Sequence, residues 1–265
     1  KFVHLGETHT EEEVATISAL INYFSPLVIL DSSDTVDYCL EKSEWDKMFA
    51  YEAEFLGKYA LVPAIGNHTY AKKGFPPVLP GAWGKKLFKK YMKLPNNEEW
   101  HTLRIANTLF ITLNSTWYLE WPQRILKTQI DWLKSTLAEA TDGVDDPKFI
   151  VIQHHIPPFS SGPLYREFLE RWVMRKYFVP VYETYGVDLV LSAHDKITEH
   201  SIKGGVHYVQ TATGEVGNPL QTPNPYKVYL NSTDNTILVC EVSAEAIVCK
   251  ILKSTGEVLH MFIIP

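Results

Sequence analysis

The chain has 265 residues, of which 45% are hydrophobic and 12% aromatic, and its formal net charge is −6 at pH 7. This length and composition are sufficient for one globular domain, 1–265, with a sizeable core. The acidic balance argues against a protein that binds the nucleic-acid backbone. No apolar run approaches the ~20 residues of a membrane-spanning helix, so the sequence predicts no membrane span.

Strand-like apolar runs alternate with helical patterns through most of the chain. They predict strands at 2–5, 27–30, 59–65, 149–153 and 187–191, a hairpin over 100–113, and helices at 10–24, 43–56, 85–91, 123–140 and 164–185. The short 85–91 helix interrupts a long loop over 69–97. The aromatic residues of this loop either line a substrate cleft or pack the loop down, and they are Tyr70, Phe75 and Trp83.

The last third of the chain has only strand patterns. We expect strands at 198–203, 206–211, 236–242, 246–252 and 258–264, with a hairpin turn at Gly204-Gly205 between the first two. Strand–helix alternation followed by hairpins predicts two sheets packed face to face, with helices outside them.

The three cysteines are Cys39, Cys240 and Cys249. Cys240 and Cys249 stand in two neighbouring strand patterns, so they could form a disulfide across a hairpin. The alternative is that both are small buried apolar residues, and we favour this second interpretation. The cysteines therefore leave the redox compartment open.

Five short polar segments each follow an apolar run, and they are spread over most of the chain. They are Gly6-Glu7-Thr8-His9, Ser33-Asp34, Gly66-Asn67-His68, His154-His155-Ile156-Pro157 and Ala193-His194-Asp195-Lys196. Ligands of open α/β sheets gather outside the carboxyl ends of the strands, so we expect the five segments to converge. Their oxygen and imidazole donors suit Mn, Fe or Zn better than metals that prefer thiolates.

In this order the segments resemble the sequence blocks of the calcineurin-like metallophosphoesterases. The family pattern is Asp-x-His, Gly-Asp, Gly-Asn-His, a His two residues before Pro, and Gly-His-x-His. The stretch 205–214 is similar to a strand and glycine turn of the purple-acid-phosphatase-like branch. The resemblance implies an α/β fold, a four-layer α/β/β/α sandwich of two mixed sheets with flanking helices.

The resemblance also implies an activity. Family members hydrolyse phosphomonoesters or phosphodiesters with metal-bound hydroxide, using one or two divalent transition-metal ions such as Mn, Fe or Zn. The substrate is then a small molecule or another phosphorylated species, and the oligomeric state stays open. His68 matches the family's catalytic histidine, which protonates the leaving group or steadies the transition state.

The resemblance implies two metal positions that share one carboxylate, Asp34. One position is complete, with ligands matched by Asp34, Asn67, His155 and His194. His154 competes with His155 for one role, and we favour His155 because it stands two residues before the proline. Consecutive strand residues point to opposite faces, so His154 should lie in the core or behind the ligands.

The other metal position departs from the family pattern. Glu7 replaces the family's Asp and Lys196 replaces its last His, whereas His9 and Asp34 are retained. A protonated lysine is not a metal ligand. We expect Lys196 to pair with Glu7 or Asp34 and to place its charge where the ion would be. The sequence therefore predicts that one ion is bound tightly rather than two.

Further departures weaken the case for full activity. Ser33 and Ala193 replace two family glycines, and Thr69 stands where the family has an acidic residue. Asp37, not Tyr38, stands where purple acid phosphatases have a tyrosine ligand, so no iron–tyrosinate chromophore is expected. These changes support a second hypothesis, in which the chain binds a phosphate-bearing ligand or partner without efficient turnover.

Overall fold

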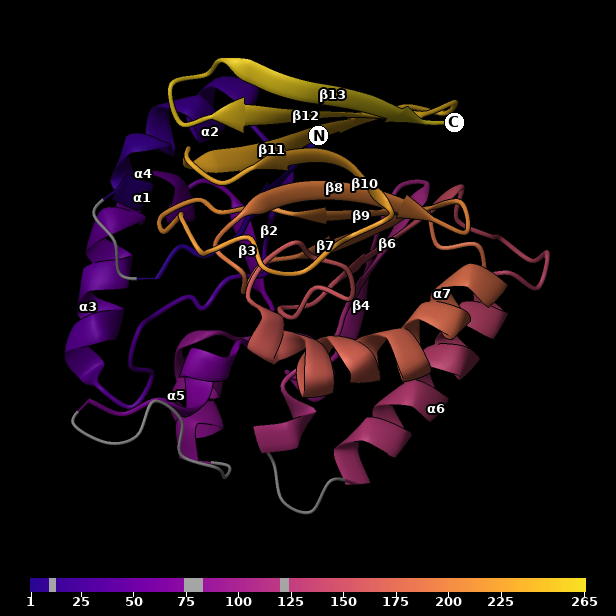
Figure 1. Ribbon diagram of the computed structural model, residues 1–265, viewed down its shortest axis with the longest axis horizontal. Helices are drawn as coiled ribbons and strands as arrows, with labels where there is room; N and C mark the ends of the chain where they lie inside the picture. The colour runs from indigo at the N-terminus through magenta and orange to yellow at the C-terminus, as the bar shows by residue number, and fades with distance from the viewer. Residues whose placement is uncertain (10–12, 74–82, 120–123) are drawn as a thin grey trace.

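Two mixed β-sheets pack face to face at the centre of the computed structural model, which describes residues 1–9, 13–73, 83–119 and 124–265 (Figure 1). The first sheet has the order β13-β12-β11-β1-β2-β3, and the second has the order β10-β8-β9-β7-β6-β5-β4. In the first sheet β1, β2 and β3 are parallel. In the second sheet β5, β6, β7 and β9 are parallel. The remaining pairs are antiparallel.

The strands are short, and each has the following bounds. The first sheet contains β1 (Phe2–Leu5), β2 (Val28–Asp31), β3 (Ala60–Pro63), β11 (Thr236–Val242), β12 (Ile247–Lys253) and β13 (Val258–Ile264). The second contains β4 (His101–Ile105), β5 (Thr108–Thr112), β6 (Phe149–Gln153), β7 (Leu189–Ser192), β8 (Thr198–Lys203), β9 (Val206–Gln210) and β10 (Lys227–Asn231).

Helices cover the outer faces of both sheets (Figure 1). They are α1 (Glu13–Thr16), α2 (Ser18–Phe24), α3 (Lys42–Tyr51), α4 (Ala53–Leu56), α5 (Trp83–Tyr91), α6 (Arg124–Glu139) and α7 (Val179–Thr184). Shorter helical turns are η1 (Asn67–Tyr70), η2 (Trp117–Leu119), η3 (Leu164–Arg166), η4 (Glu167–Arg171) and η5 (Met174–Phe178). Among the described residues, no helix combines the length and apolarity that crossing a membrane requires.

Side-chain alternation along the strands separates the layers. In β2, Val28 and Leu30 pack between the two sheets, whereas Ile29 packs against α2 and α4 on the outer face. In the second sheet, Ile150 and Ile152 of β6 face α6 and the 164–184 helical region. Three apolar clusters thus lie between four layers, and the predicted α/β/β/α sandwich is confirmed.

Some predicted elements have different bounds in the structure. The expected 164–185 helix is divided into η3, η4, η5 and α7, and the two η turns in its middle are π-helical. Pro180 lies in the first turn of α7, where its missing N–H leaves no bond unmade. The 43–56 helix divides at Glu52. The start of the expected 10–24 helix and Phe75 lie outside the described residues.

Strand β10 is an element that sequence patterns did not predict. It follows a proline-rich stretch and lies at the edge of the second sheet beside β8, and none of its residues is fully buried. An edge strand with solvent on several sides lacks the continuous apolar run that identifies a buried strand.

The cysteine interpretation that we favoured is wrong. Cys240 and Cys249 form a disulfide, although both are also fully buried. They are paired directly opposite each other in β11 and β12, with 4.2 Å between their Cα atoms. The register of two strands decides which side chains face each other, and composition alone does not give it.

Removal of this disulfide should destabilise the fold. We expect the Cys240→Ala, Cys249→Ala double variant to lose about 2–3 kcal/mol of unfolding free energy, because the unfolded chain regains loop entropy. Urea denaturation with and without reductant measures the loss. Cys39→Ala is the control, since Cys39 is not part of a disulfide and reductant should still destabilise that variant. An unchanged midpoint in the double variant would contradict the prediction.

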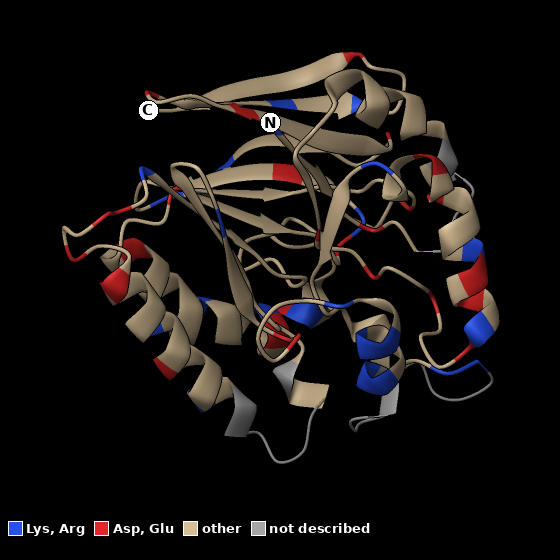
Figure 2. Cartoon of the chain, turned by 180° about the vertical axis from the view of Figure 1, so that it is seen from behind, with Lys and Arg blue, Asp and Glu red and all other residues tan. Residues whose placement is uncertain are grey.

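Positive charge gathers on α5, which is largely blue in Figure 2. Lys85 and Lys89 of this helix bond to the same carboxylate, that of Glu99, at 2.9 and 2.7 Å. This pairing attaches α5 to the segment that leads into β4, beside the aromatic cluster around Trp45 and Phe88. The α5 helix is therefore fixed to the sandwich by both charge and apolar packing.

Candidate metal centre

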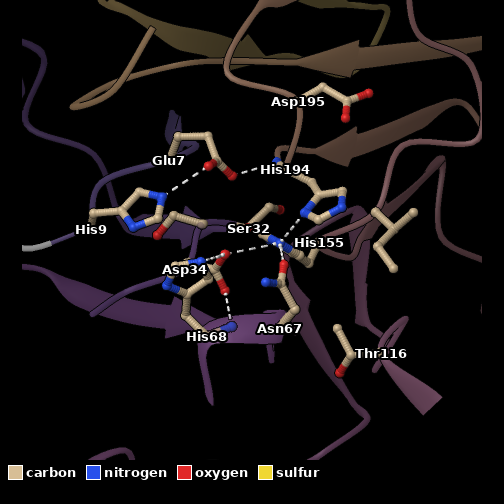
Figure 3. Close-up of polar contacts among 12 residues, drawn as sticks. Glu7, His9, Ser32, Asp34, Asn67, His68, Thr116, His155, His194 and Asp195 are labelled. Atoms are coloured by element: carbon tan, nitrogen blue, oxygen red, sulfur yellow. Dashed lines mark hydrogen bonds and ion pairs between the residues drawn. The ribbon is translucent and has the colours of Figure 1, made fainter. Parts of the chain in front are cut away.

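The five polar segments converge at the carboxyl ends of β1, β2 and β3 from one sheet and of β6 and β7 from the other (Figure 3). Among the residues that the structure describes, three groups of potential donors lie there, each with its donor atoms within 4.8 Å of one another. They are Asp34 with His155 and His194, Glu7 with His9 and Asp34, and His9 with Asp37 and His68. Asp34 belongs to two of the groups, so one carboxylate faces both metal positions that the sequence indicated.

The position predicted to be complete is built around His155. Its Nε2 lies 2.9 Å from Asn67 Oδ1, 2.9 Å from His194 Nδ1 and 3.3 Å from Asp34 Oδ2. Its other nitrogen, Nδ1, donates to the Ser32 carbonyl at 2.8 Å. All four predicted side chains therefore direct a nitrogen or oxygen at the same point (Figure 3).

Outer hydrogen bonds fix which nitrogen of each imidazole faces this point. His155 Nδ1 is taken by Ser32, and His194 Nε2 is taken by the Glu170 carboxylate at 2.9 Å. In the neutral rings, two lone pairs then face each other across 2.9 Å. Facing lone pairs repel unless a proton or a cation lies between them. A carboxylate, an amide oxygen and two such imidazoles fit a divalent transition-metal ion.

In the absence of a metal, a proton on His155 lies between the two facing nitrogens. Burial opposes a charge on His155, but Asp34 and Glu7 outweigh it and raise its pKa to about 9. The pKa of His194 is lowered, because burial and the nearby Arg166 both oppose its charged form. A metal that binds here must therefore displace a proton from His155, which makes its affinity increase with pH over the neutral range.

Glu170 is a site residue that sequence reasoning missed. It lies in η4, and its two carboxylate oxygens bond His194 Nε2 at 2.9 Å and the Tyr118 hydroxyl at 2.8 Å. Burial opposes its charge, but His194, Tyr118 and Arg166 prevail and lower its pKa to about 2. A carboxylate behind a histidine ligand fixes the ring and increases its basicity. No spacing motif connects Glu170 with His194, so only the folded chain reveals the pair.

Loss of the Glu170 carboxylate should weaken metal binding without removing a ligand. We expect Glu170→Ala to lower the affinity for Zn²⁺ or Mn²⁺ by about 10–100-fold, measured by competition with a chromophoric chelator. Glu183→Ala is a matched control, because Glu183 also bonds a side-chain nitrogen, that of Lys203, but away from the donors. Equal affinities in Glu170→Ala and the control would show that Glu170 does not position His194.

The other position brings Glu7 and His9 together beside Asp34. Glu7 Oε2 lies 3.0 Å from His9 Nε2, and Glu7 Oε1 accepts the His194 backbone N–H. His9 Nδ1 bonds Asp37 at 2.7 Å, which turns Nε2 toward the site. Burial opposes the charge of Glu7, but His9 outweighs it and lowers the pKa of Glu7 to about 2.

The prediction that Lys196 pairs with Glu7 or Asp34 is wrong. Its ammonium pairs with Glu215 at 2.5 Å, not with Glu7 or Asp34. The reason is the loop after β9: the backbone N–H groups of Gly214 and Glu215 both donate to the Glu7 carbonyl, at 2.9 and 3.0 Å. These bonds bring Glu215 beside Lys196. The Glu7 carboxylate bonds His9 instead.

Strained backbone positions occur in two of the segments that carry these donors. Of the nine described non-glycine residues with positive φ angles, four lie here, namely Glu7 at 54°, His9 at 46°, His194 at 71° and Lys196 at 53°. Such conformations cost energy and cluster at functional sites. Gly66 has a different constraint, because a Cβ there would lie 2.1 Å from Asp34 Oδ1. The shared carboxylate thus needs a glycine beside it.

The remaining two predicted histidines have contrasting surroundings. The His68 backbone N–H donates to Asp34 Oδ1 at 2.8 Å, and its Nδ1 bonds the Asp37 carbonyl at 2.8 Å, so Nε2 faces the site, 3.8 Å from Asp34 Oδ2. His154 is fully buried and stacks on Tyr182, away from the donors. Burial lowers the pKa of His154 to about 3. His154 therefore packs in the core as a neutral ring.

Comparison with known protein families identifies the family of this chain. The family model of the calcineurin-like phosphoesterases matches residues 1–197. The chain belongs to this family. A search of curated proteins gave no match. Solved structures of low sequence identity share this fold.

Three solved structures illustrate the likeness. GAP50, described as the anchor in the inner membrane complex of Plasmodium, shares 19% identity with a TM-score of 0.78, covering 99% of this chain and 87% of that chain. Purple acid phosphatase PPD1 from yellow lupin seeds shares 14% with a TM-score of 0.81, covering 99% and 53%. PhoD shares 11% with a TM-score of 0.64, covering 100% and 71%. At these identities the likeness shows the calcineurin-like fold alone.

Proposed function

We propose that this chain is a metal-dependent phosphoesterase that hydrolyses a phosphomonoester or a phosphodiester. The observation that carries the proposal is the pair of facing imidazole nitrogens, His155 Nε2 and His194 Nδ1, beside Asp34 and Asn67. Family membership supports the reaction class, since the matching family is one of phosphoesterases. Mn, Fe and Zn suit this donor set.

Different residues would bind the metal and transfer the proton. Asp34, Asn67, His155 and His194 would hold a divalent ion, which supplies charge neutralisation for phosphoryl oxygens and lowers the pKa of a water molecule. The Nε2 atom of His68 also faces the site, 3.8 Å from Asp34 Oδ2. Because its Nδ1 donates to the Asp37 carbonyl, its Nε2 carries a proton only in the imidazolium form. In that form it can give the proton to the leaving oxygen and later regain one.

A second candidate function is the binding of a phosphate-bearing ligand or partner without efficient turnover. The Lys196–Glu215 ion pair favours it, because a cation of the chain lies where the family has a metal ligand. The fold relative GAP50 is described as an anchor, which supports a binding role for such a fold in that protein. Lysine can attract phosphate as a point charge.

A panel of aryl phosphate monoesters and diesters distinguishes the two functions. The protein is stripped with chelator and reloaded with Mn²⁺, Fe²⁺ or Zn²⁺, and release of the aryl alcohol is measured. Hydrolysis that needs the metal and disappears in His155→Ala supports the phosphoesterase. A protein that retains metal and binds phosphate, yet hydrolyses none of the esters, would exclude the phosphoesterase and favour the binding role.

A further inference from the structure

Glu215 lies beside His9, next to the metal position where the sequence lacks a ligand. One of its oxygens, Oε2, is 3.5 Å from His9 Nε2 and 2.5 Å from Lys196 Nζ. His9 Nε2 is also 3.0 Å from Glu7 Oε2. His9, the imidazole donor of this position, therefore has a carboxylate from Glu7 on one side and one from Glu215 on the other.

We propose that Glu215 replaces the missing histidine as a metal ligand, so that Glu7, His9, Asp34 and Glu215 bind a second divalent ion, best a hard one such as Mn²⁺ or Mg²⁺. The inference rests on the proposed phosphoesterase, whose other ion is held by His155 and His194. It differs from our sequence-based expectation of a single tightly bound ion, which assumed that Lys196 left this position without a fourth donor.

The backbone holds Glu215 at this place independently of its side chain. Its N–H and that of Gly214 both donate to the Glu7 carbonyl. A Cβ on Gly214 would lie 2.5 Å from the Thr8 carbonyl oxygen, so the loop is packed closely on the 7–9 segment. The Glu215 side chain is 40% exposed, and it can turn between Lys196 and an ion beside His9.

The donor set determines which ion fits. The family pattern offers two carboxylates and two imidazoles here, whereas this chain offers three carboxylates and one imidazole. Carboxylates suit Mg²⁺ and Mn²⁺, and imidazoles shift preference toward Zn²⁺. Relative to the His155 position, this position should therefore discriminate less strongly in favour of Zn²⁺ over Mn²⁺.

In this arrangement Lys196 does not replace the ion but reduces the negative charge around it. Three carboxylates that bind one ion repel one another, and one ammonium neutralises part of their charge. The charge that remains matches a divalent ion. Lys196 also competes with that ion for Glu215, so it weakens binding at this position while keeping Glu215 near it.

The experiment measures Mn²⁺ bound per chain by equilibrium dialysis, with the electron paramagnetic resonance spectrum as a second readout. Adjacent Mn²⁺ ions that share a carboxylate couple magnetically and are distinguished from isolated ions. We expect two ions in the wild type. In Glu215→Gln we expect the weaker ion to lose about tenfold or more in affinity, with loss of the coupled signal, because even outer partners of ligands cost 10–100-fold.

Two further variants complete the test. Lys196→Gln frees Glu215 and should raise the affinity of the weaker ion several-fold; an unchanged or lower affinity would count against the proposal. Glu257→Gln is the control, since Glu257 pairs with Lys253 in another part of the first sheet and should leave both ions unchanged. Circular dichroism of each variant establishes that it is folded.

The outcomes separate this inference from the proposed function. If the wild type binds one ion, or if Glu215→Gln keeps two, Glu215 is not a ligand and the inference is wrong, while the phosphoesterase proposal stands. If the wild type binds no ion at all, the proposed function itself fails.

Discussion

Asp34→Asn is expected to prevent the proposed metal binding and to abolish the proposed phosphoesterase activity. Asp34 Oδ2 lies 3.3 Å from His155 Nε2, and the same carboxylate belongs to the donor group of Glu7 and His9. Asparagine keeps the size of the side chain and an oxygen that accepts the His68 backbone N–H, but it removes the charge. Because outer partners alone cost 10–100-fold in affinity, we expect a loss of at least about 100-fold.

Metal content after exhaustive dialysis, followed by aryl phosphate hydrolysis, measures this effect. Asp31→Asn is the matched control. Asp31 is also a buried acid, three residues earlier, but its oxygens accept from Ser33 N and Thr35 Oγ1 within its own loop. The control should keep its metal. A dialysed Asp34→Asn variant with wild-type metal content and rate would show that the site is assigned to the wrong residues.

Asp195→Asn should cost about 3 kcal/mol of unfolding free energy, the lower end of the effect of breaking a buried ion pair. Asp195 is fully buried between two arginines: one oxygen lies 2.7 Å from Arg166 Nη1, and the other bonds Arg171. Arg171 is itself fully buried. Without the aspartate, its charge retains only Glu167, at 3.4 Å, as an acidic partner among the described residues.

Urea denaturation of the metal-free protein measures this loss, which keeps the metal's contribution out of the comparison. Asp46→Asn is the control, because Asp46 forms an exposed ion pair with Lys42 and such pairs contribute little. If Asp195→Asn lowers the free energy of unfolding no more than the control does, Glu167 and water are sufficient to stabilise the charge of Arg171. Arg166 also bonds the His194 carbonyl, so metal affinity should fall together with stability.

Much of the candidate metal centre could be predicted because strand ends are visible in the sequence. Asp34, Asn67, His155 and His194 each follow an apolar run, and parallel strands bring such residues to the same edge. The structure places all four around one point. The same reasoning does not reach Glu170, which lies in a helical turn and follows no strand.

The error over Lys196 has a similar origin. The family pattern shows that a lysine stands where a ligand is expected, but it does not say which acid lies opposite. That depends on a loop after β9, whose bonds to the Glu7 carbonyl bring Glu215 into reach. Side chains from loops meet according to the path of the chain in space, for which the sequence has no periodic signal.

The sequence by itself determined the layers of the sandwich and the order of the donor segments, because the period of apolar residues follows directly from strand and helix geometry. Only the tertiary structure decided that Cys240 and Cys249 are bonded, that Glu170 positions His194, and that Lys196 pairs with Glu215. These contacts join residues whose distance in space is set by strand register and loop conformation. A one-residue change in either would separate them, and no local pattern in the chain records that choice.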